Sequence, residues 1–478
     1  MSAQIGWLRP RGHQSPPLPW SQVNWLRRLA NLLVAMALAF CWSGIAEAVD
    51  AHRDPKLGLV SNLARGTKRY LVILVNFPDV QPQVPLPTVE ERAVAQVSRW
   101  YQASSYGQTR FQGTVKGPYI LPEPVERYKV SPYNYQVSSD RVYALVRDAL
   151  SLAEEGGTSI NSFDVVAVIH RCFTHPGRGY GMICYCANPG MLSKVSRGRA
   201  KYLTITTRQG TPFNKGVVVM AENFHLGFLV HDLAHAIAGV HDGVRLVGDL
   251  YDFDTQSRPR QQFQIHDAAL YMGPWDLMSQ HFLEMRQPPP GFSLFSKIRL
   301  GYLRPDQVAV IRPGETKTVR LSSLAAGGPL LGIKIPLSRE RYFLVENRQA
   351  EKIDRVLPAS GVMIYQVNEA LEEGHGLVRA ENADPSAFNF SRAPFGVEHQ
   401  ARLAFVDQKH NVAVVPIAKQ GSDYVVLVTT PAQVQDGEKI GRNLQRFQGR
   451  PDLRERLTKV LTLLERGQIS AAVAASGP

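Results

Sequence analysis

Two histidines one helical turn apart are the residues of this chain best placed to do chemistry. His231 and His235 occur in the run FLVHDLAHAIAGVHD, which is apolar enough for a buried helix. Side chains four residues apart share a helix face, so both imidazoles can bind one metal ion. Asp232 follows the first histidine, where a carboxylate can accept a proton from a water that the metal activates. The pattern predicts a hydrolytic metal site.

A third metal ligand has two candidates. Gly239 can end the helix and let the chain fold back. His241 then lies ten residues after His231, the offset of the third histidine in extended motifs of this kind. Asp249 opens the acidic turn GDLYDFD at 248–254. We favour His241, because spacing after the helix limits how far a ligand can reach. The alternative is an insertion at 241–248 that passes the role to Asp249.

Other residues near this run have weaker roles. Tyr251 follows the metal helix and is a candidate oxyanion donor, and Met278, in the tight turn GPWDLMS at 273–279, is placed to form an apolar floor beneath the metal. Asp252 and Asp254 offer oxygen ligands for a calcium ion, although surface carboxylates at a turn are the favoured interpretation. The remaining histidines, among them His225, His266, His281 and His399, have no partner at metal spacing and are assigned structural roles.

At these residues the chain resembles the immune inhibitor A metallopeptidases, which are secreted zinc endopeptidases with a metzincin-like Met-turn. The similar segments occur in the family's order and cover roughly residues 70–370. They are LVILVNFPD (71–79), SSYGQTRFQGTVKGPYILP (104–122), HDLAH (231–235), GDLYDFD (248–254), GPWDLMS (273–279), KIRLGYL (297–303), YFLVENRQ (342–349) and DRVLPASGVMIYQVNE (354–369).

The resemblance implies that His231 and His235 bind Zn²⁺, that Asp232 stands at the general-base position, and that Met278 is the Met-turn methionine. The chain departs from the family at three places. Asp232 replaces a glutamate and is shorter by one C–C bond, about 1.5 Å. A misplacement of ~1 Å can cost on the order of 10²-fold in rate. Ala238 stands where the family has glycine, and His241 occupies the offset of the family's next ligand, an aspartate.

The N-terminus predicts an export signal. Residues 1–28 carry four arginines and no acidic residue, 29–45 are almost wholly apolar, and Ala46-Glu47-Ala48 offers a cleavage site. We predict a signal peptide over 1–48, a secreted or periplasmic protein, and no stable membrane span after cleavage; an uncleaved anchor is the alternative. Cleavage lowers the net charge from +13 to +10. No basic run or aromatic–basic alternation accompanies that charge, so we predict no nucleic-acid partner.

The cysteines that remain after cleavage all lie in one glycine-rich segment, RCFTHPGRGYGMICYC. In an oxidising compartment we expect one disulfide, from Cys172 to Cys184 or Cys186. A second metal site that includes His170 and His175 is the less favoured alternative, because the CxxC spacing of structural zinc sites is absent.

Hydrophobic periodicity places these residues in an α+β fold. The family resemblance implies that residues 49–300 form a metzincin-like catalytic domain with a mixed sheet and an active-site helix. The periodicity predicts a β-rich domain over 301–430 and a helical tail over 431–478. The expected strands are 70–76, 111–120, 163–170, 316–321, 331–336, 341–346, 361–367, 402–407, 411–417 and 423–429. The expected helices are 90–103, 141–153, 221–238 and 452–466.

These observations predict a secreted zinc-dependent endopeptidase that hydrolyses protein or peptide substrates by attack of zinc-bound water. The alternative is a catalytically impaired relative that acts as an exported protein- or glycan-binding module. Asp232 is the feature that favours this alternative.

Overall fold

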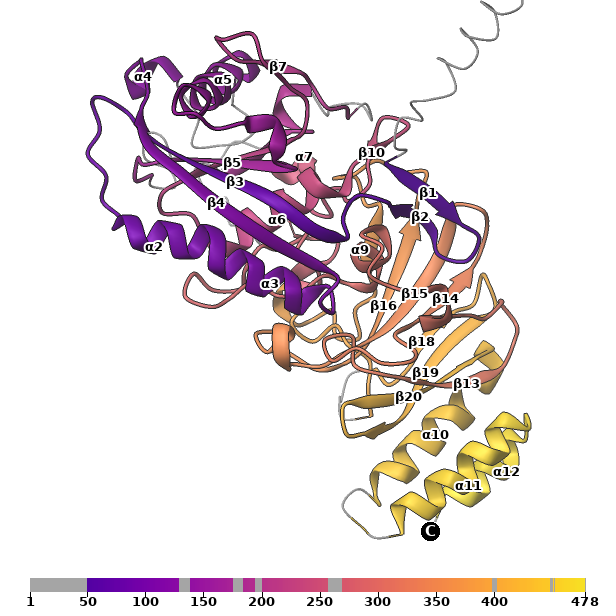
Figure 1. Cartoon of the computed structure of the whole chain (residues 1–478). Coiled ribbons are helices and arrows are strands. Elements are labelled where there is room, and N and C mark those ends of the chain that lie inside the picture. Colours follow the sequence, from indigo (N-terminus) through magenta and orange to yellow (C-terminus); the bar gives the residue numbers. More distant parts are fainter. Residues whose placement is uncertain are drawn as a thin grey trace, which may run out of the picture. The chain divides into compact units, whose positions relative to one another are not determined.

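A five-stranded mixed sheet underlies the histidine-bearing part of the chain in the computed structural model (Figure 1). In spatial order its strands are β4 (Thr109–Ile120), β3 (Gly66–Asn76), β5 (Val165–His170), β9 (Gly216–Ala221) and β6 (Cys184–Asn188). The first four run parallel, and β6 is antiparallel to β9. Residues 70–75 are fully buried, as expected for a central strand with both faces covered.

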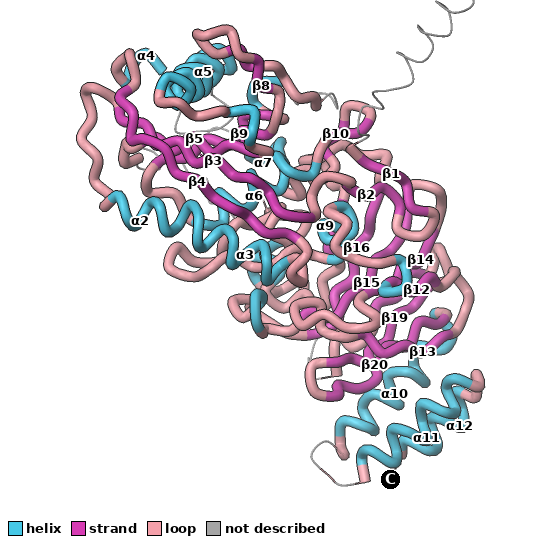
Figure 2. Tube along the Cα trace, in the orientation of Figure 1, coloured by secondary structure: helices cyan, strands magenta, loops and turns pink. Residues whose placement is uncertain are grey.

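Helices cover both faces of this sheet (Figure 2). Leu71 and Ile73 pack on the side of α5 (Ser139–Glu155), whereas Tyr70 and Val72 pack on the side of α3 (Val97–Ser104) and α6 (Leu226–Ala238). The sequence-based helices over 90–103 and 141–153 are confirmed, the first as α2 (Leu86–Glu90), a π-helical turn (Glu91–Gln96) and α3. The helix predicted over 221–238 begins only at Leu226, because Ala221 ends β9, a turn follows, and His225 is the N-cap.

The region after α9 (Leu294–Arg299) is a sandwich of two further sheets. One has the order β12 (Val308–Val310), β14 (Gly332–Pro336), β15 (Arg341–Arg348), β16 (Gly361–Asn368) and β17 (Val378–Ala380). The other has the order β13 (Lys317–Leu321), β20 (Asp423–Thr429), β19 (Val412–Gln420) and β18 (Phe405–Asp407). Each predicted strand of this region matches an observed one within three residues at either end.

Three apolar layers hold these sheets in place. Phe343 and Ile364 of one sheet meet Val414 and Val426 of the other inside the sandwich. On the opposite face of β15, Leu344 joins the core that contains α6 and α9. Because this core is shared, residues from Asp50 onward form one compact unit. The domain boundaries near 300 and 430 stay predictions.

Helices α10 (Val434–Gln445), α11 (Leu453–Glu465) and α12 (Ile469–Ser476) cover the outer face of the last sheet. The prediction of a helix at 452–466 is confirmed, but the following small-residue segment is also helical. Smaller elements are the hairpins β1 (Ala51–Asp54) with β2 (Gly58–Ser61) and β7 (Ile205–Thr206) with β8 (Pro212–Phe213), and the short helix α4 (Val125–Tyr128).

The structure describes residues 50–128, 138–174, 184–193, 200–256, 269–397, 402–447, 450 and 452–477. The predicted signal peptide, His175, His266 and His399 lie outside these residues. None of the helices in the described part of the chain combines the length and apolarity needed to cross a bilayer. The α+β class with a mixed sheet is confirmed, and the metzincin-like arrangement stays a prediction.

Candidate metal site

Helix α6 carries both histidines on one face. His225 caps it, because its Nδ1 accepts a hydrogen bond from the N–H of Gly227 at 3.0 Å. The helix packs on β9 and β6 and ends at Gly239, whose positive φ of 94° turns the chain away. His231 and His235 are therefore held rigidly, one turn apart, in the buried interior.

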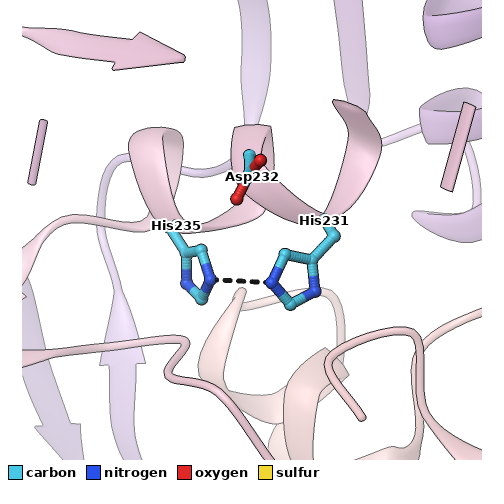
Figure 3. Close-up of side chains that lie close together, drawn as sticks. All are labelled: His231, Asp232 and His235. Carbon is cyan, nitrogen blue, oxygen red and sulfur yellow. Dashed lines mark hydrogen bonds between the residues drawn. The ribbon is translucent and has the colours of Figure 1, made fainter. Parts of the chain in front are cut away.

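The two imidazoles face each other across a short gap, with 3.0 Å between their Nε2 atoms (Figure 3). Nδ1 of His235 lies 2.6 Å from the carbonyl oxygen of Val247, and Nδ1 of His231 lies 3.2 Å from that of Leu277. A carbonyl only accepts hydrogen bonds, so each Nδ1 carries a proton and each Nε2 offers its lone pair. Metal-binding histidines commonly have this second contact to a carbonyl or carboxylate.

Asp249 completes the cluster. Its Oδ1 lies 3.0 Å from Nε2 of His231 and 3.1 Å from Nε2 of His235. Burial alone would raise the pKa of Asp249, but the charge of Arg245 and the contacts to the two histidines hold it well below its usual value. Burial lowers the pKa of His231 to about 4, so that imidazole is neutral at neutral pH.

In these tautomers the two Nε2 atoms and Oδ1 of Asp249 are three hydrogen-bond acceptors that face one another. Such an arrangement is repulsive unless a cation lies among the three atoms. Tetrahedral ligands with bonds of about 2.0–2.2 Å lie roughly 3.3 Å apart, close to the spacing observed here. His231, Asp232 and His235 also form a buried group whose ligand atoms lie within 4.8 Å of one another. This group of side chains could bind a metal ion. Oδ1 of Asp249 lies well within 4.8 Å of both imidazoles, at 3.0 and 3.1 Å.

His241, which sequence spacing favoured as the third ligand, lies elsewhere. It is part of β10 (Val240–His241), which pairs with β11 (Val244–Arg245), and its side chain is 32% exposed with Nε2 3.4 Å from Oδ2 of Asp242. The structure therefore favours Asp249. The signal for this hairpin is Asp242-Gly243, both with positive φ, because such a pair suits a two-residue turn.

A charged clamp holds Asp249 in place. Nη2 of Arg245 donates to Oδ2 of Asp249 at 2.6 Å and to Oε2 of Glu373 at 2.7 Å. Oε2 of Glu373 also accepts the backbone N–H of Asp249 at 2.9 Å. Glu373 lies between β16 and β17, so the β-rich region supplies part of the site. Neither Arg245 nor Glu373 was expected from the sequence, since no local pattern links residues 128 positions apart.

Asp232 projects from a different side of α6 than the imidazoles (Figure 3). Its carboxylate accepts a hydrogen bond from the backbone of Cys186 on β6. Burial, and then the charge of Asp249, raise its pKa well above its usual value. A cation beside it would oppose this shift. The sequence assigned Asp232 the role of general base; the structure places it near the histidines but binds its carboxylate to the sheet.

The turn around Met278 contacts both His231 and the segment that leads to Asp249. Oδ1 of Asp276 accepts the N–H of Met278 at 2.7 Å, and the Met278 carbonyl accepts the N–H of Leu250 at 2.9 Å. The same turn presents the Leu277 carbonyl to His231. Met278 itself is fully buried in the core that includes α6. In the structure, therefore, this turn orients His231.

Two further side chains border the cluster. The ring of Tyr251 stacks on His231 at 6.1 Å between centroids, and its hydroxyl hydrogen-bonds Asp249. While the Tyr251 hydroxyl is bound to Asp249, it is not available for the predicted role of hydrogen-bond donor to an oxyanion. His281, which sequence spacing set aside, packs edge-on against His231 at 4.2 Å, and its buried Nδ1 has no hydrogen-bond partner in the described residues. Its position three residues after Met278 is the only sequence signal for it.

The predicted calcium ligands have other partners. Oδ1 of Asp252 accepts the N–H of Asp254 at 2.8 Å, and Oδ2 accepts the hydroxyl of Thr255 at 2.8 Å. These contacts cap α7 (Phe253–Gln256). Asp254 has an exposed side chain near His375. A calcium site stays an untested prediction.

The disulfide prediction is wrong for the three described cysteines, whose thiols are all reduced and buried. Cys172 lies in the core on one face of the mixed sheet, whereas Cys184 and Cys186 lie on the other. The last two are two positions apart on β6, a separation of roughly 7 Å that exceeds the reach of a disulfide. The alternative second metal site included His175, which lies outside the described residues.

Comparison with known proteins adds no assignment: no family model matches this chain, and a search of curated proteins finds no match either. The functional argument therefore depends on the site itself.

Proposed function

We propose that this chain is a secreted zinc-dependent endopeptidase of the immune inhibitor A type. The observation that carries the proposal is the convergence of Nε2 of His231, Nε2 of His235 and Oδ1 of Asp249 within 3.0–3.1 Å of one another. Two imidazoles and a carboxylate leave one tetrahedral position open, which is typical of catalytic rather than structural zinc sites. The sequence resemblance supports zinc over other first-row metals.

Zinc bound there would polarise a peptide carbonyl and make a water nucleophilic at neutral pH. The protein supplies orientation and charge. The carbonyls of Val247 and Leu277 fix the imidazole tautomers, and Arg245 neutralises the oxygen of Asp249 that faces away from the pair. Asp232 is the nearest carboxylate on the helix and would exchange protons with the substrate through a water. Its hydrogen bond to β6 limits that exchange.

That same hydrogen bond favours a second candidate, a catalytically impaired relative that retains the metal and binds protein or glycan. In this function Asp232 would only tie α6 to the sheet. The metal centre would then stabilise the fold, because metal binding to the native state adds to its stability.

Cleavage of a quenched-peptide pool by the zinc-loaded protein, with and without a chelator, separates these functions. The matched variants are Asp232→Glu, which restores the longer acid, and Asp140→Glu, the same change at an exposed position on α5. We expect chelator-sensitive cleavage that increases at least tenfold in Asp232→Glu, because a ~1 Å correction of a catalytic group is worth on the order of 10²-fold. Cleavage only by Asp232→Glu would assign the natural protein to the binding class. No cleavage by either, despite bound zinc, would refute the peptidase proposal.

Export is tested separately. We propose cleavage after Ala48, so N-terminal sequencing of material recovered outside the cytoplasm should begin at Val49. An intact N-terminus would instead support an uncleaved anchor.

A further inference from the structure

A cavity of about 370 Å³ lies at the N-terminal end of α6. Its lining includes two arginines, three side-chain amides and the capping histidine of the helix. These residues are Arg92, Gln96, Asn223, His225, Arg286 and Gln287. The volume is sufficient for one large amino-acid side chain together with part of its backbone.

The charge of this cavity is positive. Arg92 is fixed in place, because its Nη1 donates to the Phe224 carbonyl at 2.8 Å and its guanidinium lies 5.3 Å above the Phe224 ring. Arg286 is exposed at the rim. His225 adds no charge in this arrangement, since its Nδ1 accepts from Gly227 and its Nε2 donates to the Gln287 carbonyl at 2.8 Å. The described lining includes no carboxylate.

One lining group still needs a donor. Oε1 of Gln287 is buried and has no hydrogen-bond partner in the described part of the chain. A buried acceptor left unpaired costs about 1–3 kcal/mol, so a ligand that brings an N–H gains an advantage once the Gln287 side chain rotates its oxygen toward the cavity. A carboxylate for the arginines and an N–H for Gln287 occur together in an acidic residue of a peptide. Inorganic anions supply only the first.

A continuous row of ring-to-ring contacts joins this cavity to the metal centre. His225 packs on Phe282 at 4.4 Å between ring centroids, and Phe282 packs on Phe228 at 5.4 Å. Phe228 packs on His281 at 4.7 Å, and His281 packs on His231 at 4.2 Å. His231 lies six positions after His225, the N-cap of α6, which corresponds to a rise of roughly 9 Å. An extended peptide covers that distance in two or three residues.

We propose that this cavity binds the aspartate or glutamate side chain of a peptide substrate, two or three residues from the bond that is cleaved. This inference rests on the proposed peptidase function. The net charge of +10 that remains after the proposed signal cleavage favours acidic partners in general, and the cavity provides a defined place for one acidic side chain.

The test uses pairs of quenched peptides in which one position holds Glu in the first peptide and Gln in the second. One such pair is made for each position up to four residues on either side of the cleaved bond. We expect kcat/KM to be about tenfold or more higher for Glu at one position two or three residues from the cut, as for a charge-assisted hydrogen bond. Arg92→Gln and Arg286→Gln should each reduce this ratio. Arg312→Gln, at an exposed site in the β-rich region, is the matched control and should leave it unchanged.

Two results would overturn the assignment: a Glu/Gln ratio near one at every position, or a ratio that persists in both pocket variants. Because Arg92 is partly buried, the folding of Arg92→Gln is checked by circular dichroism. If that variant is unfolded, the result for Arg286→Gln, at an exposed position, decides whether the pocket binds the acidic side chain. If the protein cleaves neither peptide, fluorescence anisotropy measures binding of the same pairs. Binding that requires both Glu and Arg286 would support the pocket while refuting the peptidase function; equal binding of Glu and Gln peptides would refute the pocket.

Discussion

Glu373→Gln should weaken zinc binding, although Glu373 contacts neither imidazole and reaches Asp249 only through its backbone N–H and Arg245. Its carboxylate makes contacts of 3.0, 3.0 and 2.7 Å with Arg245 and accepts the backbone N–H of Asp249 at 2.9 Å. Glutamine keeps one oxygen and replaces the other by an NH₂ group. In either orientation that NH₂ group faces a donor: Nε of Arg245 at the Oε1 position, or Nη2 of Arg245 and the N–H of Asp249 at the Oε2 position.

The magnitude follows from these contacts. A buried donor left unpaired costs about 1–3 kcal/mol, and Glu373 is only 10% exposed. Arg245 would move away from the NH₂ group of the glutamine, and the Asp249 carboxylate bound to it would then rotate away from the imidazoles. Loss of such an orienting partner typically costs 10–100-fold in metal affinity, or about 1.4–2.7 kcal/mol. We expect the zinc Kd of Glu373→Gln to rise by that factor.

The assay is competition for zinc with a chelating dye at pH 7.5, using protein whose folding has been verified by circular dichroism. Glu372→Gln is the matched control, because it makes the same change at the exposed neighbouring position. Urea unfolding of the metal-free proteins separates an effect on the site from a general loss of stability. Equal zinc affinities for the two variants, within twofold, would refute the idea that the β-rich region orients Asp249.

Three other outcomes follow from the structure. Asp249→Asn should lose most bound zinc by elemental analysis, whereas His241→Gln should retain it; the opposite pattern would restore the spacing argument. Burial lowers the pKa of His170 to about 3, so the unfolded chain takes up a proton first as pH falls. Wild-type stability should therefore fall between pH 6.5 and about 3, by up to about 1.4 kcal/mol per pH unit more than that of His170→Phe, in urea titrations. Alkylation of the unfolded protein should modify the same number of thiols with and without reductant, because the described cysteines form no disulfide.

The sequence predicted the β-rich half well, because strands such as β15 and β20 contain short, β-branched or aromatic apolar runs. It missed the strand at Gly216–Ala221 and began the helix at Ala221, because a continuous apolar run suits a buried strand or a buried helix equally. That run pairs with β5 as β9, and α6 starts only at Leu226. Local pattern does not distinguish these two forms of burial, and the choice depends on a partner strand about 50 residues earlier in the chain.

The site shows the same division. His231 and His235 were found because four-residue spacing on a helix is a local property. Arg245, Glu373 and His281 were not, since each reaches the cluster through tertiary packing that no spacing encodes. The disulfide failed for a related reason: proximity in sequence suggested a bond between thiols that the sheet separates onto its two faces.

The position of Asp249, the proposed third ligand, depends on one turn, and a glycine variant can test that dependence. The β10–β11 hairpin turns at Asp242-Gly243 and returns Arg245 to the interior, after which Leu246 donates its N–H to the Gly239 carbonyl at 3.1 Å and the chain reaches Asp249. Gly243 has φ of 80°, and alanine there costs about 1–2 kcal/mol. Gly210, with φ of 87°, sits in the turn between β7 and β8 and is the matched control. Gly243→Ala and Gly210→Ala should lose similar stability in urea, but only Gly243→Ala should bind zinc more weakly, because only its hairpin carries Arg245. Equal zinc affinity in both variants would show that Asp249 keeps its place without the hairpin.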